Sequence, residues 1–193
     1  FIITSLGSPE EVINKCKPYG IKVFCDVVEE TYAKKVTELG ADAVIAVNKN
    51  AGGHAGNLSS KELFSCIHNV CDIPIISAGG IGDKSGVDDR LSEGFSGLSI
   101  GSPFIACNES DISEEYKRAC VDYGENDIVM TTKISGTPCT VINTPYVQQV
   151  GTEQNWLEKM MSKNKKIKKW IKMLTFLKGM RSIEKAALSS TYK

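Results

Sequence analysis

The sequence has few of the features that mark metal sites, disulfide scaffolds or membrane spans. Only two of its 193 residues are histidines, so a structural zinc site has little support. Its seven cysteines are odd in number and include no Cys-x-x-C pair, which predicts reduced, buried thiols rather than a disulfide framework. The longest apolar runs, at 42–47 and 73–81, are too short to cross a bilayer. With no recognisable signal peptide, we predict a cytoplasmic protein without a metal.

The charges are unevenly distributed although the formal net charge is zero. Residues 1–150 carry 12 Lys and Arg against 20 Asp and Glu, whereas residues 151–193 carry 11 against 3. Apolar residues in the basic segment recur at spacings near three and four, which predicts helices with one apolar and one cationic face. We interpret 151–193 as a basic helical extension packed on a domain formed by 1–150. Membrane-surface and nucleic-acid binding are the alternatives, but no recognisable nucleic-acid module is present, and we predict neither partner.

Five short apolar runs, rich in β-branched residues, alternate with helical patterns. Each run has the length and composition of a strand. Runs that are so continuously apolar predict parallel strands covered on both faces, and therefore an α/β fold. The runs cover residues 1–7, 21–28, 41–47, 73–80 and 97–104.

Helix start and stop signals stand between these runs. Ser8 and Glu11 have the spacing of a capping box, and Ser59 and Glu62 repeat it before the third helical pattern. The second pattern ends on Gly40. The chain therefore reads as an alternation of strands and helices.

Two architectures fit this alternation, an open doubly wound sheet and a closed barrel. The spacing of the strands does not distinguish them. The chain begins at Phe1, already within a strand, and a complete (β/α)8 barrel takes at least about 200 residues. We predict a TIM barrel of which this chain contains the C-terminal five βα units and lacks roughly the first three.

Glycine-rich loops follow the fourth and fifth runs, where a barrel carries its active site. Glycines let backbone N–H groups approach an anion closely, and late loops with a short helix N-terminus form the usual phosphate cradle of a barrel. Either loop alone could be a simple tight turn. Because both occur in neighbouring units, we predict a phosphate-bearing ligand. The residues expected at this ligand are Ala78, Gly79, Gly80, Gly101 and Ser102.

A histidine follows the third run within a glycine-rich loop. His54 stands next to Gly53 and Gly52, which offer no side chains for it to pack against. At the C-terminal end of a strand it would face the mouth of the barrel, and histidine exchanges protons near neutral pH. We predict a functional role for His54, with a structural role as the alternative. His68 lies within a helical pattern, and we interpret it as structural.

Four segments resemble the nitronate monooxygenase family, formerly called 2-nitropropane dioxygenases. They occur in the family's order within about residues 20–145 and are specific only together. They are GADAVIA followed by AGGHAG at 51–56, IPIISAGGIGD at 73–83, IGSPFIACNES at 100–110, and EEYKRACVDYGENDIVMTT at 114–132.

The resemblance implies a TIM barrel that binds FMN without covalent attachment. By position it implies that His54 is the catalytic base. Members of the family oxidise nitronates with molecular oxygen to a carbonyl compound and nitrite, so a nitronate or nitroalkane is the implied substrate. The implied FMN contacts are Gly52, Gly53, Gly79, Gly80, Gly101 and Ser102.

The sequence departs from the family pattern at two places. Family members often carry Gln-Gly-x-Glu before Ala-Gly-Gly-His, where this chain has Val47 to Asn50 and lacks both that amide and that carboxylate. Asp26 stands where Gln or Lys is common, so an anion faces the mouth. An FMN-dependent enoyl-acyl-carrier-protein reductase using NAD(P)H shares the glycine motifs and is an alternative. An incomplete barrel with only a binding role is another, and the oligomeric state, homo-oligomers included, stays open.

Overall fold

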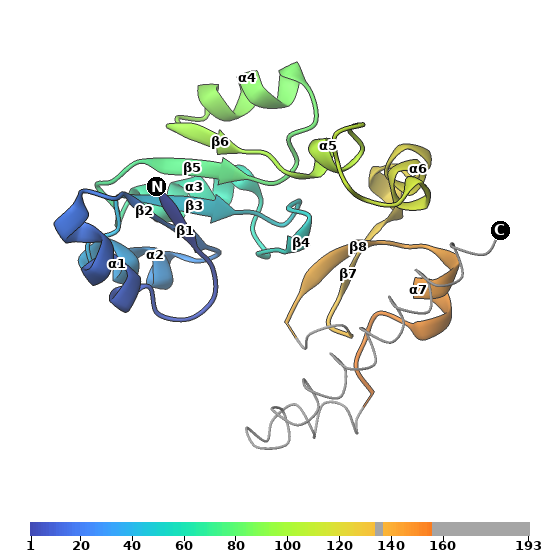
Figure 1. Cartoon of the computed structure of the whole chain (residues 1–193), viewed down its shortest axis with the longest axis horizontal. Helices are drawn as coiled ribbons and strands as arrows, with labels where there is room; N and C mark the ends of the chain where they lie inside the picture. Colours follow the sequence, from blue (N-terminus) through green and yellow to red (C-terminus); the bar gives the residue numbers. More distant parts are fainter. Residues whose placement is uncertain (134–136, 156–193) are drawn as a thin grey trace.

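A computed structural model of the chain describes residues 1–133 and 137–155, and most of the predicted basic extension lies outside this part. The main sheet has five parallel strands in the order β1-β2-β3-β5-β6 (Figure 1). The predicted strand runs all contain one of these strands. The strands are β1 (Ile2–Thr4), β2 (Val23–Val27), β3 (Ala43–Val47), β5 (Ile75–Ala78) and β6 (Gly97–Ser99).

The order of these strands distinguishes the two architectures. Each strand pairs with the next strand of this sheet along the chain, without the reversal that defines a doubly wound sheet. Successive parallel strands joined by helices form an arc of a (β/α) barrel. The predicted α/β fold of the TIM-barrel type is therefore confirmed, with five βα units.

Helices follow the strands as predicted, with one difference at the first cap. Ser59 and Glu62 form the expected capping box of α3. The predicted box at Ser8 does not form, because α1 takes Pro9 as its N-cap residue and Glu11 pairs with Lys15 instead. The Ser8 hydroxyl accepts a long hydrogen bond of 3.5 Å from the N–H of Glu10. The helices are α1 (Glu10–Cys16, continued by a 3-10 turn at Lys17–Tyr19), α2 (Glu30–Glu38), α3 (Ser60–His68), α4 (Lys84–Ser92), α5 (Ser102–Ile105), α6 (Glu114–Asp122) and α7 (Pro145–Val150). In the described part none is long and apolar enough to cross a membrane.

The sheet separates a packed core from the surface that carries the site. Alternate side chains of a strand point to opposite faces. On one face, side chains such as Cys25 and Val44 pack with Ala33 of α2 and Leu63 of α3 in the hydrophobic core. The other face carries Asp26, Ile45, Val47 and Ala78, which line a cavity instead.

A second, antiparallel sheet, which the five predicted strand runs did not include, lies at the mouth of the arc. It has the order β4-β8-β7 (Figure 1). Its strands are β4 (Gly53–His54), β7 (Ile128–Thr131) and β8 (Cys139–Ile142). β8 has only four residues and is flanked by turn residues, so its strand pattern is too short to recognise in the sequence. Its partner β4 has two residues and lies within the glycine-rich loop that contains His54.

The fifth predicted run, 97–104, is strand only at its start. Residues from Ser102 onward form α5, with Pro103 in its first turn. Proline has no N–H for a strand ladder but fits the first turn of a helix, which explains the early end of β6. The seven cysteines are free thiols, four of them buried and three partly exposed.

Candidate active site

The C-terminal ends of the parallel strands surround an open cavity of about 1430 Å³. This exceeds the roughly 300–1,000 Å³ usual for small-ligand pockets, so it has room for a cofactor and a small substrate together. The cavity brings together all the residues that the sequence singled out for the ligand and for catalysis. These are Gly52, Gly53, His54, Ala78, Gly79, Gly80, Gly101 and Ser102.

The loops after β3 and β5 are packed against each other. Asn48 is 2% exposed, and its side-chain amide donates to the carbonyl of Gly79 at 2.9 Å while its oxygen accepts from the N–H of Asn50 at 2.8 Å. A Cβ on Gly79 would lie 2.5 Å from the nitrogen of Ala51. The sequence offered no signal for this role of Asn48, which fixes the two loops to one another.

The glycines of the predicted cradle differ in what the fold requires of them. Gly79 has a φ of 109° and is enclosed by the neighbouring loop, and Gly80 has a φ of 71°. Both are therefore explained by backbone conformation and packing alone. Gly101 has a negative φ of −125°, and a Cβ built on it would meet no atom within 4 Å. Nothing in the described fold requires glycine at 101, so its lack of a side chain keeps open space in the cavity.

Ser102 follows the loop after β6 and lies close to the glycine-rich loop that contains Gly52 and His54, called the histidine loop below. A Cβ on Gly52 would lie only 2.6 Å from the Ser102 hydroxyl oxygen, so the two loops meet across the mouth. Helix α5 has only four residues, so its dipole would contribute little to the binding of a phosphate at its N-terminus. A cradle here would act through backbone N–H groups and the Ser102 hydroxyl.

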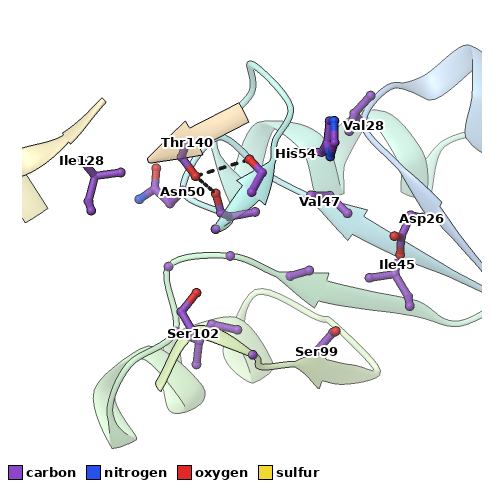
Figure 2. A pocket seen from close by; sticks show the side chains of 18 of the residues that line it. Asp26, Val28, Ile45, Val47, Asn50, His54, Ser99, Ser102, Ile128 and Thr140 are labelled. Atoms are coloured by element: carbon purple, nitrogen blue, oxygen red, sulfur yellow. Dashed lines mark hydrogen bonds between the residues drawn. The ribbon is translucent and has the colours of Figure 1, made fainter. Parts of the chain in front are cut away.

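His54 lies on the exposed strand β4, at the wall of the cavity (Figure 2). The register places it opposite Cys139 of β8. Thr140, the next residue, donates its hydroxyl to the carbonyl of Ala51 at 2.5 Å, with a longer contact of 3.4 Å to that of Gly53. These bonds, dashed in Figure 2, attach the histidine loop to a hairpin more than 80 residues later in the chain. His68 stacks on Phe64 away from the cavity.

We expect Thr140→Val to loosen the histidine loop. Valine keeps the shape of threonine but cannot donate, which leaves the buried carbonyl of Ala51 without this partner at a cost of about 1–3 kcal/mol. Amide hydrogen exchange at Gly53 and His54 should accelerate about tenfold. Thr140→Ser keeps the hydroxyl and should exchange like the native protein. Equal exchange rates in Thr140→Val and the native protein would show that the strand pairing alone holds the loop.

Two ionisable side chains among the described residues of the cavity lining, Asp26 and Tyr32, have a pKa that burial raises. Burial raises the pKa of the Asp26 carboxyl above its usual range, and a hydrogen bond with Ser5 opposes part of this shift. Asp26 pairs with Ile45 in register, and both line the cavity. In the described residues, no group of three or more His, Cys, Asp or Glu side chains could hold a metal ion.

Helix α6 and β7 add a second wall that sequence patterns did not predict. Tyr116, Cys120 and Tyr123 of this region line the cavity together with Ile128. Their segment matched a family motif, but helical and strand patterns do not reveal which cavity a side chain faces. Apart from Glu125, the side chains that this wall presents to the cavity are aromatic, apolar or the thiol of Cys120, as suits a planar organic ligand.

The chain is similar along most of its length to known oxidoreductases. A profile of the nitronate monooxygenase family matches residues 1–189. A curated protein of Rhodococcus jostii (strain RHA1), (3aS,4S,5R,7aS)-5-hydroxy-7a-methyl-1-oxo-octahydro-1H-indene-4-carboxyl-CoA dehydrogenase, is 32% identical over 146 residues, which make up 76% of this chain and 41% of that protein.

Solved structures resemble the same region. FabK from Thermotoga maritima matches with a TM-score of 0.72 and 30% identity, over 87% of this chain and 52% of FabK. A nitroalkane oxidase from Streptomyces ansochromogenes matches with a TM-score of 0.69 and 25% identity, over 77% of this chain and 47% of the oxidase.

The match covers nearly the whole chain but only part of each relative. The chain spans 37% to 44% of the length of the curated relatives that it matches. The profile, in contrast, extends from residue 1 to residue 189. The chain belongs to the nitronate monooxygenase family of flavin-dependent oxidoreductases.

Proposed function

We propose that the protein is an FMN-dependent nitronate monooxygenase, which oxidises alkyl nitronates with molecular oxygen to a carbonyl compound and nitrite. One observation carries this proposal: the His54 loop and the two glycine-rich loops line a single cavity, in a chain of the nitronate monooxygenase family. The solved nitroalkane oxidase among the similar structures supports the same class of substrate.

Two of the loops that line the cavity would bind the cofactor. Ala78, Gly79, Gly80, Gly101 and Ser102 would hold the phosphate of FMN, because their small side chains leave backbone N–H groups within reach of an anion. The open space beside Gly101 suits this role, since a Cβ would intrude on it. FMN, when bound, supplies the electron acceptor and the site that reacts with oxygen.

His54 and its loop would act on the substrate. Gly52 and Gly53 have no side chains, so the loop leaves room in the cavity for the imidazole of His54. When the substrate arrives as a neutral nitroalkane, His54 takes the proton from the carbon that bears the nitro group. The hydroxyl of Thr140 holds the backbone of this loop in place and thereby orients the base.

Oxygen uptake and nitrite release test the proposed reaction. Purified protein supplied with ethylnitronate in air should consume oxygen and release nitrite and acetaldehyde, without any need for NADH. Boiled protein and protein stripped of flavin serve as controls. Flavin-containing protein that leaves ethylnitronate and other small alkyl nitronates untouched would contradict the proposed activity.

A second candidate is an FMN-dependent reductase of enoyl-acyl-carrier-protein type, which uses NAD(P)H. The similarity to a carboxyl-CoA dehydrogenase favours a thioester substrate of this kind, and the volume of the cavity would accommodate an acyl chain. NADH oxidation that depends on an enoyl thioester such as crotonyl-CoA would support this candidate. The nitronate enzyme should show none.

A further inference from the structure

Asp26 is a charged residue in the cavity that the proposed reaction does not use. It lies one residue before the C-terminal end of β2, and its side chain is on the face of the sheet opposite the hydrophobic core (Figure 2). It lines the cavity beside Ile45 and is only partly exposed. The carboxylate interacts with the Ser5 hydroxyl. An ionised carboxylate has about four acceptor positions, so Asp26 can accept further hydrogen bonds from a ligand.

The other charges of the cavity have mostly the same sign. Among the described residues that line it, Glu29 and Glu125 are acidic like Asp26, and Lys35 is the one lysine or arginine. Lys35 lies on α2 and is exposed to solvent. Glu29 and Glu125 are exposed as well, so solvent screens them as it screens Lys35. Among the charged lining residues that the structure describes, Asp26 is the partly buried one, and a ligand group beside it would meet a negative charge.

We propose that Asp26 determines substrate specificity by accepting hydrogen bonds from a protonated amine that the substrate carries away from its reacting carbon. The inference rests on the proposed function for the reacting end of the substrate and adds the chemistry of the other end. A nitro compound with an alkylammonium group would place its positive charge at Asp26, and its nitro-bearing carbon would lie toward the loop of His54. A substrate with a carboxylate in place of the amine would meet a like charge in a partly desolvated site.

Binding of small probes tests this proposal without turnover. Propylammonium and propionate are similar in size and opposite in charge, and isothermal titration calorimetry on the flavin-loaded protein at pH 8 and constant ionic strength compares them. We expect propylammonium to bind about tenfold more tightly than propionate. Asp26→Asn should abolish this preference while the variant stays folded, because burial already disfavours the charged form of this side chain.

A neighbouring charge provides the matched control. Glu30→Gln removes one negative charge from α2 at a residue outside the cavity lining, so it should leave the preference unchanged. Equal binding of the two probes by the native protein, no binding of either, or an undiminished preference in Asp26→Asn would each overturn the proposal. A clear preference in a protein that does not oxidise nitronates would reject the proposed function and retain the role of Asp26.

Discussion

His54→Asn is expected to slow the turnover of a neutral nitroalkane by about 10²- to 10⁴-fold while the flavin stays bound. Asparagine has a similar volume and can form a hydrogen bond, but it cannot act as a base. His54 lies on β4, which pairs with β8 through backbone bonds, so the substitution should leave the loop intact. Steady-state kinetics with nitroethane, together with the flavin content of the purified variant, measures the effect.

The ionised substrate separates proton removal from other roles of His54. Ethylnitronate has already lost the proton that a base would remove, so its oxidation should survive far better in His54→Asn than the oxidation of nitroethane. Similar losses with both substrates would indicate that His54 positions the substrate anion or the flavin. Unchanged rates with both would return His54 to a structural role.

Gly101→Val is expected to release FMN without unfolding the protein. A Cβ at this position meets no protein atom within 4 Å, and its backbone conformation does not require glycine. A valine side chain would instead occupy space that the phosphate needs, and we expect affinity for FMN to fall by at least about 100-fold, the loss of two or more charge-assisted hydrogen bonds. Flavin fluorescence during titration of the apoprotein measures the dissociation constant, and circular dichroism reports the fold.

Gly97→Val is the matched control in the same βα unit. Gly97 lies at the start of β6, outside the cavity lining, and its Cβ would be 3.8 Å from Ile76 in ordinary contact. Native FMN affinity is expected in this variant. If Gly101→Val bound FMN as well as Gly97→Val does, the phosphate would lie elsewhere. Gly80→Val is a poorer test, because its φ of 71° and a 3.0 Å contact of its Cβ with Asn50 would strain the loop even without a ligand.

Much of the fold could be predicted because buried parallel strands leave a strong sequence signal. Runs such as 41–47 are continuously apolar, since both faces of the strand are covered, and helix caps such as Ser59 stand between them. A barrel and a doubly wound sheet can be told apart by the order of the strands in the sheet, and this order depends on pairing between segments distant in the sequence. Propensity and periodicity describe neighbours along the chain and do not contain this information.

The candidate site was predictable in its residues but not in its construction. Glycine motifs and His54 stood out because their residue types are unusual at strand ends. The hydrogen bonds that hold the site's loops together could not be predicted from the sequence. Thr140 donates to the carbonyl of Ala51, 89 positions away, and Asn48 donates to the carbonyl of Gly79, 31 positions away. Each depends on one polar side chain whose partner is a backbone carbonyl, and any residue supplies a carbonyl. The capping box expected at Ser8 failed for a local reason: Pro9 takes the N-cap position, and the Ser8 hydroxyl accepts from the N–H of Glu10 at 3.5 Å instead of completing the box with Glu11.

The visible spectrum of the purified protein under anaerobic conditions, with ethylnitronate and NADH added in separate experiments, tests the proposed nitronate oxidation most directly. We expect a yellow protein whose flavin absorbance is lost on addition of ethylnitronate and returns when air is admitted. NADH should leave the absorbance unchanged. Loss of the flavin absorbance with NADH but not with ethylnitronate would contradict the proposed nitronate oxidation, as would purified protein without bound flavin.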